Sequence, residues 1–259
     1  MSHSAISLGL GLGGGKSATS SGAPGGGGGY VNEYSLTFDG GDAYMNAGTS
    51  SDYSIVGGGS ISYWIYPFVA GLSGYKESAA KMDTGGWQIM HSPGGSAIAI
   101  VAYNHTYSGG YPTVTMNNPV NEWFLVSLVF HASGGATLYL NDGAAGASGT
   151  GQTSAKPSYS YTEDASAPLY FARHPTSLTR CFPGNMDEIA VFSSELSASD
   201  VEDIYNGGEP VDLKSYSLAS WWRMGDKNGH TGDTIPNQVI GSNNGILENG
   251  PTYSTNVPS

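Results

Sequence analysis

The sequence predicts an all-β protein, a single sandwich of sheets with one short helix. Three observations predict this class. Glycine supplies 40 of the 259 residues, and each one inside a helix would cost about 1 kcal/mol, which excludes long helices. Aromatic residues make up 11% of the chain, including 17 Tyr and 5 Trp, and they favour strands. From residue 35 onward, short apolar segments alternate with clusters of Gly, Pro, Asn and Ser.

These apolar segments are four to eight residues long, the usual length of a strand. Several are apolar on both faces, and we expect such segments to be inner strands covered on two sides. The predicted strands are Ser35–Phe38, Ser60–Tyr66, Trp87–His91, Ala97–Ala102, Phe124–His131, Ala136–Leu140, Leu169–Arg173, Met186–Phe192 and Ser220–Arg223.

One helix of about two turns is predicted to begin after Ser197. This serine is suited to cap the helix, and Asp200 follows three residues later, near the positive end of the helix dipole. Gly207 and Gly208 end the helix. Its apolar stripe consists of Val201, Ile204 and Tyr205, and we expect this stripe to pack on the sandwich edge.

Residues 1–29 form a separate glycine-rich unit, so we divide the chain into an N-terminal arm (1–29) and a domain (30–259). The arm holds 11 glycines and one charged residue, Lys16, too little apolar surface to fold alone. One interpretation is a flexible tail. The other is an extended strand that docks on a partner's sheet edge, because alternate positions carry the aliphatic residues Ile6, Leu8, Leu10 and Leu12.

Charge and cysteine content exclude several classes. The formal net charge is −12, with nine Lys and Arg, which argues against a nucleic-acid binder with a basic face. Cys181 is the single cysteine, so no intrachain disulfide forms. No apolar run reaches 18 residues, so no membrane span is expected. The N-terminus lacks the basic and apolar regions of an export signal, so we expect a protein that stays in its cell or leaves within something larger.

An ordered series of motifs runs from about Ser35 to Gly208. It consists of Leu36-Thr37-Phe38-Asp39-Gly40, Tyr44-Met45-Asn46, Ser60–Pro67, Trp123 with Phe124–Phe130, Leu138–Gly143, Leu169–Arg173 and Gly184–Phe192. The series resembles LamG-like domains of the concanavalin A-like superfamily, which implies a two-sheet antiparallel jelly-roll. Trp221–Asp226 and Asn243–Leu247 resemble a segment that usually precedes the first of these motifs. We therefore expect a circular rearrangement, in which the C-terminal segment supplies those strands.

The resemblance includes glucan-cleaving enzymes, but their Glu-x-Asp-x-x-Glu strand is absent from the sequence. Asp187 and Glu188 are adjacent on a predicted strand, so we expect them on opposite faces, unable to act as a catalytic pair. We predict no catalytic residues, and a glycan-cleaving enzyme remains a minor alternative.

Calcium is the cofactor that the resemblance implies. Asp39 and Asp187 lie at the family's recurrent acidic positions, and Asp226 is a third candidate ligand. The alternative is that Asp39 and Asp187 accept hydrogen bonds from turns or from the backbone.

Glycan binding is the commonest role of such domains. Two predicted loops are rich in tyrosine, whose rings can stack on sugars; the candidates are Tyr103, Tyr107, Tyr111, Tyr159 and Tyr161. The alternative is ordinary packing of these tyrosines or a protein interface.

Two functions remain. The first is a non-enzymatic, structural or adhesive virion component, such as a capsid decoration, head fibre or tail fibre, anchored by the arm on the virion surface. The glycine-rich opening resembles that of uncharacterised marine phage virion proteins. The expected partners are other virion or assembly proteins, and cell-surface glycans, in a homo-oligomer or a larger assembly. The alternative is a free-standing, extracellular carbohydrate-binding module.

Overall fold

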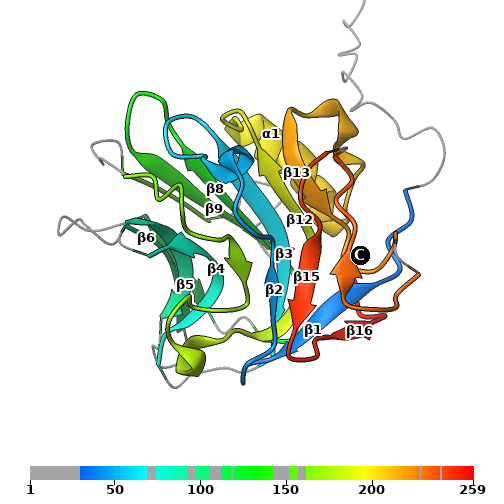
Figure 1. The fold of residues 1–259 in the computed structure, drawn as a ribbon. Coiled ribbons are helices and arrows are strands. Elements are labelled where there is room, and N and C mark those ends of the chain that lie inside the picture. Colours follow the sequence, from blue (N-terminus) through cyan, green and yellow to red (C-terminus); the bar gives the residue numbers. More distant parts are fainter. Residues whose placement is uncertain are drawn as a thin grey trace, which may run out of the picture.

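The computed structural model describes residues 30–259 other than 69–73, 84, 93–96, 105–111, 118–119, 143–151, 157–161, 228 and 240. Two eight-stranded sheets face each other (Figure 1), and every pairing between the described strands is antiparallel. The predicted jelly-roll sandwich is confirmed.

Sheet A contains, in spatial order, β10 (Gln152–Lys156), β9 (Ala136–Asp142), β8 (Phe124–Phe130), β3 (Ser60–Pro67), β12 (Pro183–Phe192), β1 (Ser35–Asp39) and β16 (Thr252–Ser254), with β13 (Leu218–Trp222) also paired to β12. Sheet B contains β14 (Thr234–Ile235), β15 (Gly245–Glu248), β2 (Tyr44–Asn46), β11 (Tyr170–Phe171), β4 (Lys76–Met82), β5 (Gly86–Ser92), β6 (Ala97–Asn104) and β7 (Thr113–Asn117).

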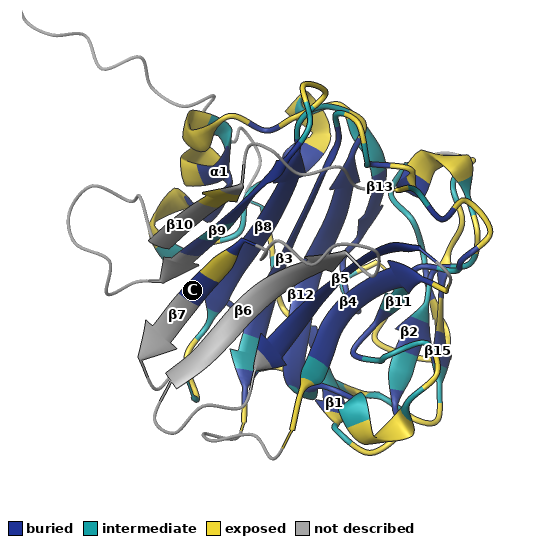
Figure 2. Cartoon of the chain, turned by 90° about the vertical axis from the view of Figure 1, so that its left-hand side faces the viewer, coloured by how far each residue is buried: buried dark blue, intermediate teal, exposed yellow. Residues whose placement is uncertain are grey.

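The main core fills the space between the two sheets. Alternate residues of each strand point into it, as expected for a strand period of two: Leu36 and Phe38 from β1, and Trp87 and Ile89 from β5, are all buried. Tyr63 adds a polar link across the core, since its hydroxyl lies 2.7 Å from the Ser78 hydroxyl. Figure 2 shows the inner strands of both sheets buried along most of their length.

A second apolar cluster covers the outer face of sheet A. Helix α1 (Ala198–Tyr205) lies over this face, and its Val201 and Ile204 pack with Trp64 and Trp221 of the sheet. The Ser197 side chain caps the helix as predicted, and Asn206, with φ of 44°, ends it. Within the described ranges, no helix is long and apolar enough to cross a membrane.

Strand β4 is missing from the sequence prediction because three of its seven residues are charged. The structure buries two of them by pairing: Glu77 with Arg180, and Lys81 with Glu163 at 2.9 Å. A buried charge is tolerated only when it has such a partner. The strand predicted over Leu169–Arg173 is shorter, since β11 stops before Ala172, whose φ is 63°.

The C-terminal strands complete both sheets beside the N-terminal ones. β16 pairs with the outer edge of β1, and β15 pairs with β2. β13 pairs with β12. The C-terminal segment thus supplies neighbours for the first two strands, as the expected circular rearrangement requires.

Residues 30–34 join the arm to the domain, and a buried group centred on Arg223 holds them. We call Arg223, Glu188, Asp226 and Asp187 the Arg223 cluster. The Arg223 guanidinium donates to Glu188 Oε1 at 3.1 Å and to Asp226 Oδ2 at 2.8 Å. All four side chains are at most 5% exposed. Charge pairing at this depth requires nearly complete hydrogen bonding to offset desolvation.

Each of the five linking residues contacts this cluster. The Tyr30 ring lies 4.3 Å from the Arg223 guanidinium, and Arg223 also donates to the Val31 carbonyl. Asn32 donates to Asp187 Oδ2 at 2.9 Å. Asp226 Oδ1 accepts from the N–H groups of Glu33 and Tyr34, at 3.0 and 2.9 Å. The chain is therefore fixed to the outer side of sheet A from Tyr30 onward.

A β-bulge brings Asp187 and Glu188 to the same side of β12, so the expectation of opposite faces was wrong. The register shifts between Asp187 and Ala190, and Glu188 has φ of 47°. Glu188 Oε2 accepts a hydrogen bond from the Trp221 indole at 2.7 Å, on the outer face of sheet A. Asp187 lies on the same face, because it is directly opposite Trp64 in the strand register. The extra residue of a bulge breaks the two-residue alternation.

Replacing Arg223 tests whether the cluster holds the fold together. Arg223→Met keeps a long side chain but leaves buried carboxylates without a cation, so we expect the free energy of unfolding to fall by about 3–5 kcal/mol. Urea unfolding followed by tryptophan fluorescence measures it. Lys214→Met removes a side chain that is 76% exposed and should change stability by less than about 0.5 kcal/mol. A similar small change for Arg223→Met would contradict this role.

The cluster also predicts a pH dependence. Burial, and secondly the Glu188 carboxylate, raise the pKa of Asp187 well above its usual range. The folded state therefore keeps a proton that the unfolded chain releases above pH of about 3.9. The stabilising contribution of Asp187 is complete below that pH and is lost as pH rises through the folded-state pKa, with a slope of up to about 1.4 kcal/mol per pH unit.

Asp187→Asn should remove this part of the pH profile, because an amide carries no charge. The Asn32 amide can turn to offer its Oδ1, which is buried without a hydrogen-bond partner. Urea titrations between pH 5 and 9 measure the slope. The control is Asp52→Asn, at an exposed carboxylate. If the free energy of unfolding changed with pH by the same slope in wild type and Asp187→Asn, the prediction would be wrong.

Candidate functional site

Most of the tyrosines predicted to bind ligand lie outside the described residues. These are Tyr107, Tyr111, Tyr159 and Tyr161, and the same holds for the arm residues Ile6, Leu8, Leu10 and Leu12. Tyr103 is on β6, where its backbone is opposite Gln88 of β5. The role assigned to all these residues stays a prediction.

The three aspartates proposed for calcium do not converge. Asp226 pairs with the Arg223 guanidinium, and Asp187 accepts hydrogen bonds from Asn32 and the Glu188 N–H. Asp39 is at the other end of β1, where its Oδ1 accepts from the Gly41 N–H at 2.8 Å, as in the turn alternative. In the part of the chain that is described, no three His, Cys, Asp or Glu residues form a group that could hold a metal ion. As placed, these residues do not fit a calcium ion.

The outer face of sheet B carries a different constellation, on β2 and β11. These strands pair with Tyr170 opposite Asn46 and Phe171 opposite Met45. Met45 and Phe171 are buried in the core. The two-residue alternation therefore directs Tyr44, Asn46 and Tyr170 outward.

Tyr44, Tyr170 and Arg173 form what we call the tyrosine platform. The two rings meet edge to face, with their centres 5.7 Å apart. The Arg173 guanidinium lies 4.3 Å from the centre of the Tyr44 ring and 5.3 Å from that of Tyr170. The left-handed Ala172 ends β11, and Arg173 follows it directly. Burial raises the pKa of Tyr44, so its hydroxyl stays protonated and can donate.

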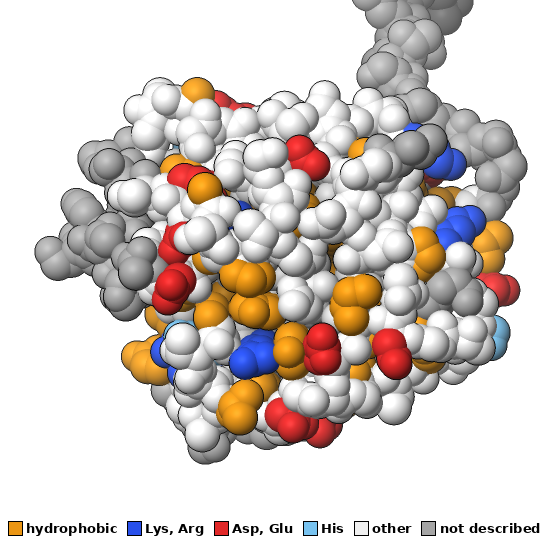
Figure 3. Space-filling model, in the orientation of Figure 1, with side chains coloured by type: hydrophobic (Ala, Val, Ile, Leu, Met, Phe, Trp, Pro, Cys, Tyr) orange, Lys and Arg blue, Asp and Glu red, His pale blue; other side chains and the backbone are white. Residues whose placement is uncertain are grey.

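A hollow of about 290 Å³ adjoins the platform. Asn46 connects the two regions, because it lines the hollow and lies between Tyr170 of β11 and Ile246 of β15 in the strand register. Ile246 is 41% exposed. Figure 3 shows hydrophobic side chains gathered on this side of the molecule around basic ones, with acidic side chains beside them. The hollow is lined by Asn46, Ala47, Gly48, Asn243, Asn244 and Ile246.

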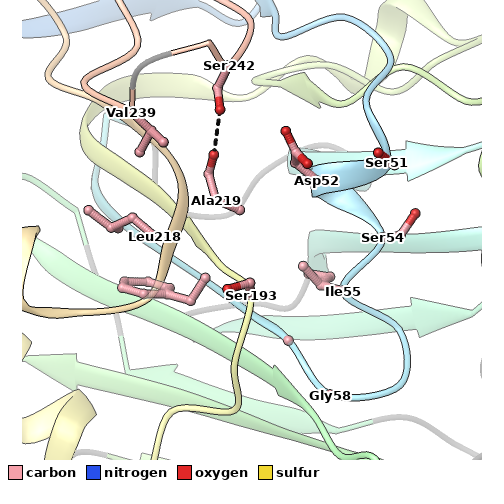
Figure 4. A pocket seen from close by; sticks show the side chains of 12 residues that line it. Ser51, Asp52, Ser54, Ile55, Gly58, Ser193, Leu218, Ala219, Val239 and Ser242 are labelled. Atoms are coloured by element: carbon pink, nitrogen blue, oxygen red, sulfur yellow. Dashed lines mark hydrogen bonds between the residues drawn. The ribbon is translucent and has the colours of Figure 1, made fainter.

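Another hollow, of about 420 Å³, lies near the start of β3 and the end of β12 (Figure 4). It presents hydroxyl groups and one carboxylate, Asp52, and the Ser242 hydroxyl donates to the Ala219 carbonyl at 2.8 Å. Its one aromatic residue, Phe192, is fully buried. It therefore offers no open ring face for stacking, which distinguishes it from the platform.

The carboxylate pair in the Arg223 cluster offers no open catalytic site. Each oxygen of Asp187 and Glu188 accepts a hydrogen bond from the chain itself: from the Glu188 N–H, Asn32, Arg223 and Trp221. Both side chains are at most 4% exposed. In this arrangement a sugar has no access to the carboxylates.

Sequence reasoning missed the platform as a ligand site. Tyr44-Met45-Asn46 and Tyr170-Phe171 alternate polar-aromatic and apolar residues, a pattern that indicates half-exposed strands. That signal could have pointed to Tyr44 and Tyr170 singly. It could not show that the two strands are neighbours, because that depends on long-range pairing.

Solved structures with the same architecture include a protein from Bacteroides ovatus named as a "putative carbohydrate binding protein". The TM-score is 0.61 at 18% identity, over 88% of this chain and 61% of that one. A heptameric pentraxin from Limulus polyphemus gives a TM-score of 0.52 at 12% identity, over 72% of this chain and 91% of that one. At these identities the likeness shows the fold alone. This chain spans less than two thirds of the Bacteroides protein.

No curated protein matches the sequence. The Laminin_G_3 family model, by contrast, matches residues 39–202, most of the described domain. This match covers strands of both sheets and the beginning of α1. The chain belongs to the concanavalin A-like lectin/glucanases superfamily.

Proposed function

We propose that this protein binds carbohydrate without cleaving it and that the tyrosine platform is the binding surface. The observation that carries the proposal is the placement of Tyr44, Tyr170 and Arg173 beside a hollow lined by asparagines. Sugar rings have apolar faces that stack on aromatic rings, and their hydroxyls pair with amides and charged groups. Tyr44 and Tyr170 are partly exposed, and the asparagines line the hollow beside them, so one surface carries both kinds of residue.

The lectin-like fold of this chain and of the Bacteroides protein agrees with the proposal. Glucan cleavage needs two accessible carboxylates at a defined separation. The adjacent pair, Asp187 and Glu188, is buried with its oxygens occupied. These features support a binding role rather than a hydrolytic one.

We further propose that residues 1–29 attach the domain to an assembly, specifically a virion; the grounds are the glycine-rich composition of the arm and its resemblance to phage virion proteins. The Arg223 cluster supports this geometry. It holds residues 30–34 on the outer side of sheet A, whereas the platform lies on the outer face of sheet B. A domain held through residue 30 would leave the platform free for glycans.

Removing the platform rings tests the binding proposal. Each stacking contact contributes about 1 kcal/mol, so we expect Tyr44→Ala with Tyr170→Ala to weaken affinity at least about ten-fold. A glycan array identifies the ligand, and calorimetry then measures affinity. The matched control is Tyr75→Ala, which removes a tyrosine that is 47% exposed and outside the platform. The proposal would be refuted if the folded wild-type protein bound no glycan on the array, or if the double variant bound the ligand with unchanged affinity.

Deleting residues 1–29 tests the attachment proposal separately. The free energy of unfolding and glycan affinity should stay unchanged, because the truncated chain keeps the contacts that residues 30–34 make with the Arg223 cluster. Incorporation into particles should be lost. Tagged chains supplied during particle assembly and probed by immunoblot of purified particles provide the measurement. Normal incorporation of the truncated chain would contradict the role of the arm.

A further inference from the structure

Arg173 differs from the other two arginines of the chain. Arg180 pairs with Glu77, and Arg223 pairs with Glu188 and Asp226. Arg173 makes no ion pair with any described carboxylate. We infer that the platform binds a sugar carrying a carboxylate, and that Arg173 is the group that pairs with it. This inference rests on the proposed function and names the ligand class of the same site.

The position of Arg173 suits this role. The guanidinium is held against the faces of Tyr44 and Tyr170 at 4.3 and 5.3 Å, and its Nε donates to the His174 carbonyl at 3.3 Å. A guanidinium ordered before the ligand arrives loses less rotamer entropy on binding. Its planar fork matches a carboxylate with two parallel hydrogen bonds, whereas a neutral hydroxyl uses only one.

Neighbouring charges indicate a sparsely charged glycan. Glu248 is directly opposite Tyr44 on β15, and the whole chain has a net charge of −12. This field repels a densely sulfated polymer at long range. A glycan with a single carboxylate is repelled much less, and its ion pair with Arg173 offsets that repulsion at short range. Sugars of the uronic or sialic type have this chemistry.

The test compares acidic sugars with neutral partners of the same shape. The probes are galacturonic acid against its methyl ester, and sialyllactose against its methyl ester, each titrated calorimetrically into the full chain. In at least one pair, we expect the acid to bind at least about ten-fold more tightly than its neutral partner. A hydrogen bond to a charged group has a free energy that corresponds to a difference of this size.

Arg173→Gln should abolish the preference, because the glutamine amide carries no charge to pair with a carboxylate. Arg173→Lys keeps the charge but not the fork, and it should retain part of the preference. Lys214→Gln removes the same charge from a side chain that is 76% exposed in the 3₁₀ turn Leu213–Ser215 and should change nothing. Circular dichroism and thermal unfolding establish that each variant is folded.

The outcomes separate the two proposals. Equal binding of acid and neutral partner, or a preference that survives Arg173→Gln, overturns the inference but leaves glycan binding intact. Failure of both acids to bind, while the array shows a neutral ligand on the platform, overturns it as well. If no glycan binds the folded chain, the proposed function fails together with the inference.

Discussion

The pairing of Arg223 with Glu188 and Asp226 is the interaction on which the placement of both chain ends depends. Arg223 neutralises two carboxylates, and one of these, Asp226, accepts the N–H groups of Glu33 and Tyr34. Since these groups are buried, loss of the arginine would leave their charges without a counter-charge and shielded from water. The C-terminal half of the chain thereby determines where the strand β1 enters sheet A.

The bulge at Glu188 makes this arrangement possible. In a regular strand Glu188 would point toward the apolar core between the sheets, away from Arg223. The positive φ of Glu188 instead turns it toward Arg223 and Trp221. Backbone strain of about 1–3 kcal/mol at such a residue is offset by the hydrogen bonds that it allows.

The two outer faces of the sandwich have different surroundings. Helix α1 and the loop after it cover sheet A with an apolar cluster. Around β2, β11 and β15, sheet B instead leaves tyrosine, asparagine and isoleucine side chains partly exposed. The proposed attachment point and the proposed binding surface thus fall on opposite sides of one domain, an arrangement that follows from which sheet the helix covers.

Hydrophobic alternation and glycine spacing were sufficient to predict the sandwich, the capped helix and strands such as β3 and β8, because these signals are local in the chain. Strand β4 was not predicted because the burial of Glu77 and Lys81 depends on ion pairs with residues from distant segments. Glu77 pairs with Arg180, and Lys81 pairs with Glu163. The same limit applies to Tyr44 and Tyr170. The apolar strands and the capped helix could be read from the sequence, because their signals are local. Only the folded structure shows that Tyr44, Tyr170 and Arg173 meet, since strand pairing brings together residues that no local pattern connects.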